Sequence, residues 1–403
     1  DSINARHTDL SFRFIRQSDA ILFVTYYNHA FSHADSEFLV QLGRVKDAFE
    51  MDKMFFIVNA IDLAESEEDA SDVLAYVRAN LSRFGIKRPR LHAVSSLAIL
   101  KEKLAGEHRG TQFENAFHHF IFHDLAGLAV RAAEGDYARA QTLLSRLIEE
   151  SEESAEKKAE RRDALEKSAQ RAAHLLASQS SDDIKKRAAQ EQEELLHYVA
   201  ERVFLRYENM FRLSFNAATL GREHGKASLQ KAMKELLASL GFDLAQEMRA
   251  TAVRLERFLA KRGKEMQETL AKTLSEGERD FSFGVEATEF DFDLSFPTAF
   301  ADVEPQVFTK ELALFKSPAQ FFEKGGSKIM AEALKERLRP MVSAYLEREG
   351  ARLEERVLSG SRAVFEAALA HVRREAQGYY EGHRAALAGG LSAVKLREIR
   401  AKL

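Results

Sequence analysis

The sequence predicts a mainly α-helical protein that also contains an α/β part. Residues 1 to about 105 alternate short apolar runs with amphipathic stretches, the pattern expected of strands and helices in turn. Glycine (20) and proline (5) are scarce among the 403 residues, and 30% of the chain is charged, which favours long helices over sandwiches or barrels. No proline occurs between Pro89 and Pro297, so very long helices are permitted there.

The α/β part is predicted from three short apolar runs. Residues 20–27, 54–60 and 90–96 have the length and composition of parallel strands that are buried on both faces. Helical spacing of apolar residues fills the two gaps, over residues 35–50 and 67–85. Alternating strands and helices predict a doubly wound sheet. Three strands with two crossovers make half of such a domain, and we assign this half to 1–110.

A long antiparallel helical stalk is predicted from about residue 112 onward. The charged segment 149–163 is interpreted as a solvated helical stretch or a hinge. We assign 111–280 to the outgoing stalk and 326–403 to its returning helices. Apolar stripes at helical spacing support the bundle; they are Leu196, Val199, Val203, Tyr207 and Met210; then Leu237, Leu240, Leu244, Met248, Leu255 and Leu259; then Leu334, Leu338, Met341 and Tyr345.

A phenylalanine-rich segment, residues 281–325, interrupts the helical pattern. Apolar and acidic residues alternate in its first part, which is an extended period, and we expect the segment to form the far end of the bundle. Two interpretations remain open: a small core where the helices reverse, or a membrane-inserting paddle with some phenylalanines exposed. The acidic residues outnumber Lys310 and Lys316, which counts against adsorption to anionic lipid. The candidates for membrane contact are Phe290, Phe292, Phe296, Phe300, Phe308, Phe315, Phe321 and Phe322.

Composition excludes several classes of function. The chain has no cysteine, so disulfides, thiol catalysis and thiolate metal sites are ruled out, and a reducing cytosolic setting fits. A net charge of −4 gives no electrostatic reason to expect nucleic-acid binding. No apolar run approaches the roughly 20 residues that span a bilayer. The first ten residues are neither a signal peptide nor a start at Met, so we interpret this end as a cut.

Two polar side chains, Asn59 and Asp62, follow the central predicted strand. Side chains at the carboxyl edge of a parallel sheet project into the crevice where ligands bind. A carboxylate at this edge can accept hydrogen bonds from N1–H and the exocyclic amine of guanine, whereas adenine offers the opposite pattern. Asn59 would fix the loop and the base. In the alternative interpretation the motif only starts the next helix, with Asp62 or Ser66 as its N-cap.

Ser95 and Ser96 follow the next predicted strand, where a backbone N–H and small hydroxyl residues commonly support the base. This order of strand, Asn-x-x-Asp, helix, strand and Ser-Ser is that of the last part of a GTPase domain. Residues 3–62 resemble the bacterial dynamin-like proteins, particularly the two-headed type with two GTPase-plus-stalk units. In that family a DxPG motif comes just before the segment that opens this chain. The close resemblance covers residues 1–100, and beyond them it rests on architecture.

The resemblance implies the second half of a GTPase domain followed by a helical stalk with a Phe-rich tip. Asn59 and Asp62 match the base-reading motif, and Ser95 and Ser96 match the last guanine-contacting loop. Most GTPases carry Lys at the position of Ala60, so nucleotide affinity should be modest. The cofactors implied for the parent protein are GTP and Mg²⁺. The segment 1–8 would belong to the loop that senses the γ-phosphate.

The phosphate-binding loop of a GTPase is missing from this sequence. No G-x-x-x-x-G-K-[ST] motif occurs; residues 221–228 are a near miss, and 325–328 are interpreted as a turn. The phosphate-binding Lys and the Mg²⁺ ligands should therefore lie outside these 403 residues, and we expect this fragment to be inactive alone. His119 and His123 are four apart, but no third ligand lies at a convincing spacing, and we predict no metal site. His29 and His33 are interpreted in the same way.

The resemblance also implies partners and a location. They are a guanine nucleotide, membrane lipids through the tip, and a second copy through the GTPase heads or the stalk, on the cytoplasmic face of the cell membrane. The first hypothesis is a GTP hydrolase that remodels, fuses or tethers membranes through head dimerisation. The alternative is a non-enzymatic helical scaffold or tether whose nucleotide-binding part is vestigial.

Overall fold

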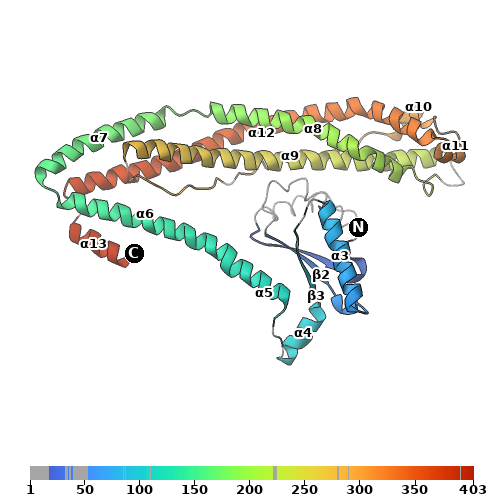
Figure 1. The fold of residues 1–403 in the computed structure, drawn as a ribbon. Helices are drawn as coiled ribbons and strands as arrows, with labels where there is room; N and C mark the ends of the chain where they lie inside the picture. Colours follow the sequence, from blue (N-terminus) through green and yellow to red (C-terminus); the bar gives the residue numbers. More distant parts are fainter. Residues whose placement is uncertain are drawn as a thin grey trace. The chain divides into compact units, whose positions relative to one another are not determined.

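The computed structural model resolves the chain into two compact units (Figure 1). Unit 1 comprises residues 1–162, 282–284 and 382–403, and unit 2 comprises residues 163–281 and 285–381. The predicted boundary near residue 110 coincides with neither limit, because the helices that follow the sheet belong to the same unit as the sheet. The structure describes residues 18–31, 35, 38–39, 53–84, 86, 88–106, 108, 110–220, 225–278, 281–288, 290–390 and 392–403. The expected γ-phosphate loop at 1–8, His33 and most of the predicted helix 35–50 lie outside the described residues.

Unit 1 contains the predicted parallel sheet. Its strands are β1 (Ile21–Tyr26), β2 (Met54–Asn59) and β3 (Arg90–Val94), in the order β1-β2-β3. All pairings are parallel, with Tyr26 opposite Asn59 and Asn59 opposite Val94. The first five residues of β2 are buried, as expected for a central strand with both faces covered. The structure therefore confirms the three strands and the α/β character of this part.

The helices of unit 1 fall into two groups, one beside the sheet and one further along the chain. Phe55 of β2 makes edge contacts with the rings of Phe113, Phe117 and Phe120, which attaches the second helix after β3 to the sheet. The elements are α3 (Glu67–Arg83), α4 (Ser96–Ala105), α5 (Gln112–His119), the π-helix η5 (Phe120–Leu125), α6 (Ala126–Glu152) and α13 (Ala393–Lys402).

The end of α6 packs against the end of the chain. Leu147 and Ile148 form a small core with Ala386 and Leu396. Next to it, His383 Nδ1 lies 2.6 Å from Glu150 Oε2, and both side chains are buried. The last helix, α13, therefore contacts α6 through Leu396, and the residues that precede it are held to α6 by a buried polar pair.

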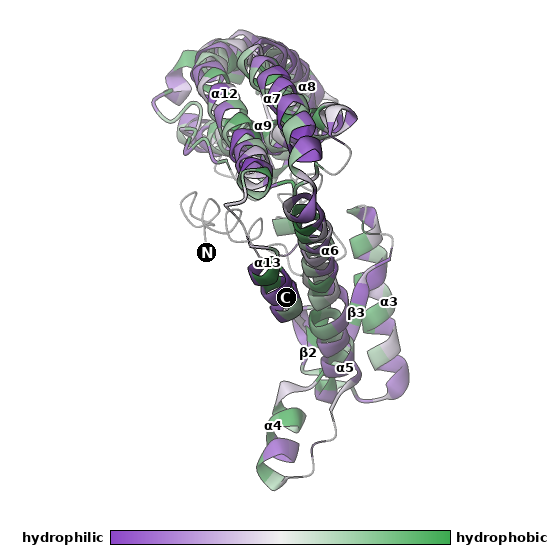
Figure 2. Ribbon diagram, turned by 90° about the vertical axis from the view of Figure 1, so that its left-hand side faces the viewer, coloured by the Kyte–Doolittle hydropathy of each residue, from purple (hydrophilic) through white to green (hydrophobic). Residues whose placement is uncertain are grey.

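Unit 2 is a bundle that contains α8 (Asp182–Ser214), α9 (Lys226–Gly277) and most of α7 (Ala155–Ala177) and α12 (Gly326–Leu387). Most residues of the predicted stripes are buried, from Val199 and Val203 in α8 to Leu334 and Leu338 in α12, and the others (Leu196, Met210 and Met341) are partly buried against the same core. Each helix carries both hydrophilic and hydrophobic residues, as Figure 2 shows, so that one face of each can be buried. The mainly α-helical fold class with an α/β part is confirmed.

We call residues 285–304 the strap; its described residues, 285–288 and 290–304, form no helix and lie along the bundle. Going up the strap, the main chain at Glu286, Phe292 and Ala299 bonds to Gln267, Glu256 and Gly241 of α9 in turn. Because the partner numbers fall as the strap numbers rise, the strap runs antiparallel to α9. The hydroxyl of Tyr345 on α12 donates to Pro297 O at 2.8 Å, which ties the strap to a second helix.

The position of the strap corrects one expectation. The extended character of this segment is as predicted, but the segment does not lie at the far end of the bundle, because its apolar side chains pack into the core along α9 and α12. The short elements that follow it do lie at that end, next to the end of α8 and the start of α12 (Figure 1). They are η6 (Pro305–Phe308), α10 (Thr309–Leu312) and α11 (Pro318–Glu323). We call this end of unit 2 the bundle tip.

Helix glycines make room for the strap. A Cβ on Gly241 would lie 1.9 Å from Ala299 O, a contact that no side chain tolerates. A Cβ on Gly360 would lie 2.5 Å from the Phe290 ring. Glycine at these two helical positions lets the strap backbone and its rings approach the helix axes closely.

Candidate functional site

Asn59 ends β2 and links the ends of two neighbouring strands. Its Oδ1 accepts hydrogen bonds from Ser96 N at 3.1 Å and from Ser96 Oγ at 2.9 Å. Ser96 is the first residue of α4, which begins directly after β3. The amide of Asn59 therefore holds the loop after β2 against the loop after β3, and the carboxyl edge of the sheet has a defined shape.

Asp62 lies three residues further on, in the 3₁₀ turn η4 (Ile61–Leu63). The side chain is exposed, and its carboxylate makes no hydrogen bond or ion pair with any residue that the structure describes. Ala60 stands between the two polar residues in the left-handed conformation, with φ 60° and ψ 38°, and turns the chain out of the strand. Asp62 is therefore free to accept hydrogen bonds from a ligand.

The N-cap of α3 is Ser66 and not Asp62. Ser66 Oγ accepts from Asp69 N at 3.1 Å and caps α3, so the helix does not use Asp62 for this purpose. Ser95 is likewise an N-cap, because its Oγ accepts from Ala98 N at 3.0 Å and closes the first turn of α4. Of the two serines, Ser96 contacts Asn59 and Ser95 shapes the helix start.

These four residues lie at one edge of the sheet and provide a defined set of groups. Asn59, Ser95 and Ser96 fix two loops by hydrogen bonds, and Asp62 offers two carboxylate oxygens to the solvent. A carboxylate with two free acceptors matches two adjacent donors, which is the pattern on the Watson–Crick edge of guanine. The sequence identified the four positions, but it did not indicate that Ser96 bonds to Asn59.

A hydrogen-bond network that joins α4 to α5 was not anticipated from the sequence. His108 Nδ1 lies 2.9 Å from Glu102 Oε2 and His108 Nε2 lies 2.7 Å from Glu114 Oε2, so one imidazole joins α4 to α5. Hydrogen bonds to Glu102 and Glu114 raise the pKa of His108. The backbone N–H of Thr111 and the ammonium of Lys103 lower the pKa of Glu114 to about 2. The spacing Thr111-x-x-Glu114 is a capping box that could have been recognised in the sequence.

Most of the proposed membrane-contact phenylalanines are not on the surface. Four of the eight are buried in the core of unit 2, which is a correction, because a ring that is already in a core has no face left for a membrane; they are Phe292, Phe296, Phe308 and Phe321. Phe290, Phe300 and Phe315 are partly buried against the same core. Phe322 is 42% exposed, and it is the one candidate that projects from α11.

Other exposed apolar residues lie on the elements of the bundle tip. Val307 of η6 and Ile329 in the first turn of α12 are 50% and 59% exposed. Leu213, at the end of α8, is also exposed. Because none of these is a phenylalanine, a search for aromatic clusters in the sequence did not select them.

The described residues contain no cluster of His, Asp and Glu that could hold a metal ion. The ring centroids of His119 and His123 lie 4.8 Å apart with the rings tilted by 36°, and His119 Nδ1 lies 3.8 Å from Asp124 Oδ1. No helix in the described part of the chain has the length and apolar character needed to cross a bilayer.

The chain is similar to known proteins over most of its length. Residues 1–61 match the dynamin family. Dynamin-like protein A of Bacillus subtilis (strain 168) is 31% identical over 358 residues, which are 86% of this chain and 29% of that protein. A solved structure described as an oligomerised bacterial dynamin pair, with a mechanism for long-range sensing and tethering of membranes, is 15% identical. Its alignment covers 96% of this chain and 58% of that chain, with a TM-score of 0.28.

A three-stranded parallel sheet with Asn-x-x-Asp at its carboxyl edge, followed by long helices, is consistent with a partial GTPase domain and a helical stalk. The family match and the B. subtilis relative support a bacterial dynamin-like protein, in agreement with the resemblance of residues 3–62. The chain spans 29% of the length of the B. subtilis relative.

Proposed function

We propose that this chain is part of a dynamin-like GTPase and that the edge formed by Asn59, Asp62, Ser95 and Ser96 binds the guanine base. The observation that carries the proposal is the contrast between Asn59, which is bonded to Ser96, and Asp62, which is exposed and has no hydrogen bond or ion pair with the residues that the structure describes. Asp62 accepts from N1–H and the exocyclic amine of guanine, and Asn59 holds the two loops that flank the base. GTP and Mg²⁺ are the cofactors of the parent protein, and residues outside these 403 hold the phosphates and the metal.

The same proposal includes a membrane contact at the bundle tip. Phe322, Val307 and Ile329 are exposed on the short elements and the helix start of this end, and they bury apolar area when they enter the headgroup region. Dimerisation of GTPase heads, driven by nucleotide, moves the stalk and the tip in this scheme. The protein is a peripheral one on the cytoplasmic face of the cell membrane, and it remodels, fuses or tethers membranes.

The non-enzymatic scaffold is the second candidate function, and the free carboxylate of Asp62 disfavours it. In a vestigial site we would not expect the Asp62 carboxylate to remain exposed next to the two loops that Asn59 and Ser96 hold together. The sequence of the longer protein decides between the two: a phosphate-binding loop followed by DxPG supports the enzyme, and its absence supports the scaffold.

The test of the base site is Asp62→Asn in the full-length protein, with Asp72→Asn on the exposed face of α3 as the matched control. The asparagine removes one acceptor and adds a donor, so GTP affinity should fall by about 1.5–3 kcal/mol, the value of a charge-assisted hydrogen bond. Xanthosine triphosphate carries a carbonyl where guanine has its amine, so its affinity should rise. Equilibrium titration measures the affinities for GTP and for xanthosine triphosphate. If Asp62→Asn and the wild type have the same two affinities, the assignment is refuted.

The test of the tip compares Phe322→Ser with Phe292→Ser in a liposome flotation assay. Phe322 is exposed, so its replacement should reduce flotation and leave the melting temperature nearly unchanged. Phe292 is buried, so its replacement should lower the free energy of unfolding by about 3–5 kcal/mol, as for other large core truncations. Flotation that is undiminished in Phe322→Ser would show that this side chain does not contact the membrane.

A further inference from the structure

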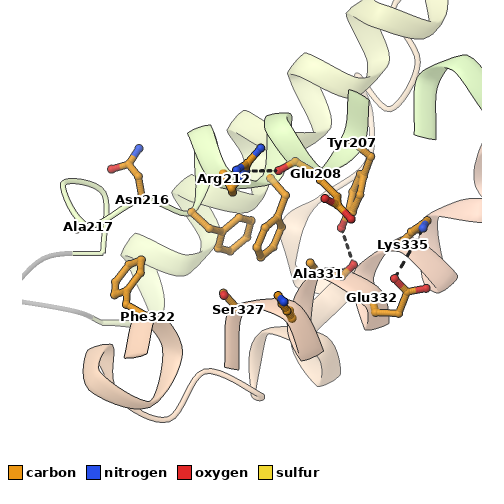
Figure 3. Close-up of a pocket in the computed structure, with 13 residues that line it drawn as sticks. Tyr207, Glu208, Arg212, Asn216, Ala217, Phe322, Ser327, Ala331, Glu332 and Lys335 are labelled. Carbon is orange, nitrogen blue, oxygen red and sulfur yellow. Dashed lines mark hydrogen bonds and ion pairs between the residues drawn. The ribbon is translucent and has the colours of Figure 1, made fainter. Parts of the chain in front are cut away.

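A cavity of about 810 Å³ lies at the bundle tip, between the last turns of α8 and the first turns of α12 (Figure 3). Its volume is within the roughly 300–1,000 Å³ typical of small-molecule sites. All the residues that line it belong to unit 2, and the apolar ones are Tyr207, Phe211, Phe215, Ala217, Phe322 and Ala331. Phe322 is the one residue of the lining that the proposed membrane contact also uses, and the interior of the cavity has no role in either proposal so far.

The aromatic wall of the cavity suits an aliphatic chain. The rings of Phe211 and Phe215 stack at 4.7 Å, and Tyr207 lies next to Phe211 along the same face of α8. The Tyr207 hydroxyl donates to Ala331 O at 2.8 Å, so it leaves no unsatisfied donor in this wall. Burial raises the pKa of Tyr207 and keeps the hydroxyl neutral. A peptide would leave its backbone groups unpaired against such a wall, whereas a hydrocarbon chain would not.

Cationic side chains lie around the apolar wall. Lys335 pairs with Glu332 at 3.7 Å, so these two charges largely cancel. Lys328 is exposed in the first turn of α12 and forms no ion pair with the described residues, and Arg212 donates only to the main-chain oxygen of Glu208 at 3.4 Å. The positive end of the α12 dipole lies next to Lys328, and Glu208 is the remaining carboxylate. The balance of charge at the opening therefore favours an anionic head.

We propose that this cavity holds one acyl chain of an anionic phospholipid, with the phosphate of the lipid held by Lys328 and Arg212. The inference rests on the proposed membrane contact and gives it a specific lipid site. Phe322 is both exposed and part of the cavity wall, so the surface that meets the membrane is continuous with the cavity. Among the residues that line the cavity, the carboxylates are Glu208 and Glu332, and none of them belongs to the Phe-rich segment.

The first experiment measures binding of a monomeric lipid to the 403-residue chain. Dioctanoyl phosphatidylglycerol, below its critical micelle concentration, is titrated by calorimetry against the wild type, Ala331→Phe and Ala333→Phe. Ala331 lines the cavity, so a phenylalanine there fills it, whereas Ala333 is a similarly half-buried alanine on the same helix outside the lining. Affinity should fall at least tenfold in Ala331→Phe and stay within twofold in Ala333→Phe, and circular dichroism melting checks that each variant is folded.

The second experiment tests the head group. Lys328→Glu and Arg212→Glu should each weaken binding about fivefold, the equivalent of roughly 1 kcal/mol per cation near an anionic lipid. Dioctanoyl phosphatidylcholine should bind more weakly than dioctanoyl phosphatidylglycerol. Equal binding of the two lipids, or undiminished binding in Ala331→Phe, would overturn the assignment.

Flotation of the same variants separates this inference from the proposal on which it rests. Wild-type protein that floats with phosphatidylglycerol vesicles but does not bind the monomeric lipid defeats the cavity site and leaves the membrane contact standing. Protein that binds the monomeric lipid through the cavity but does not float defeats the membrane contact and leaves the cavity as a lipid site.

Discussion

Asn59 and Asp62 show how neighbouring residues of one motif have different physical roles. The amide of Asn59 is used within the protein, because it bonds to both the main chain and the side chain of Ser96. The carboxylate of Asp62 makes no such bond with the described residues and is left for a ligand. Ala60 makes the turn between them at positive φ, which costs an alanine on the order of 1–2 kcal/mol.

His108 is a second residue whose chemistry is determined by its neighbours, and it makes local stability depend on pH. Its folded pKa lies above the unfolded value of 6.5 because two carboxylates accept from the imidazolium. Because the folded pKa is raised, the contribution of His108 to the free energy of unfolding is fully present below pH 6.5 and is lost as the pH rises through the folded pKa. Protection factors, which are exchange rates corrected for the intrinsic effect of pH, should therefore be higher for the amides of α4 and α5 at pH 6 than at pH 8.

The control for this effect is His108→Gln, which should remove the pH dependence between pH 6 and 8. Glu114 acts in the opposite range: its folded pKa is lowered to about 2, so its contribution is present above pH 4.5 and is lost as the pH falls toward 2. An identical pH dependence in His108→Gln and the wild type would show that another group is responsible.

At the scale of elements, the close packing of the strap requires glycine in the helices that it contacts. Gly241→Ala should lower the free energy of unfolding by about 1–3 kcal/mol, because the new Cβ would meet the main chain of Ala299 and an overpacked backbone cannot yield easily. Gly378 is the matched control in α12: a Cβ there meets nothing within 4 Å. Gly378→Ala should raise the free energy of unfolding by up to about 1 kcal/mol through helix propensity. Urea unfolding measures both, and stabilisation by Gly241→Ala would show that the strap does not lie against α9.

The strands, the long helices and the extended strap could largely be predicted from the sequence. Where the strap packs in the bundle could not. Periodicity identified the three strands and the long helices, because burial of one face leaves a regular apolar pattern. It also identified the extended character of the strap. Its place along α9 depends on grooves that Gly241 and Gly360 open in two separate helices, and no local pattern contains that information. For the same reason the phenylalanine count did not distinguish the buried Phe292 from the exposed Phe322.

At the scale of the whole molecule, these 403 residues contain the proposed base site but no phosphate-binding motif. We predict that the 403-residue chain alone shows no Mg²⁺-dependent GTP turnover and binds GTP barely or not at all. Positioning of the phosphates and the metal supplies nearly all of the catalysis in this class of reaction, and the chain contains no phosphate-binding motif. Phosphate release assays on the purified chain measure this, with the full-length protein as the positive control, and turnover by the chain alone would contradict the prediction.

The pairing of α8 with α12 has a consequence during synthesis of the chain. Tyr207 bonds to a residue 124 positions later, and Gln192 to one 158 positions later. A ribosome adds about 5–20 residues per second, so the aromatic face of α8 waits on the order of 6–25 s before α12 is available to cover it. Over this interval α8 and α9 can pair as a hairpin, but Tyr207, Phe211 and Phe215 have no partner from α12. We therefore expect the cavity at the bundle tip to form only after the start of α12 has been synthesised, and its aromatic wall to stay exposed on the nascent chain until then.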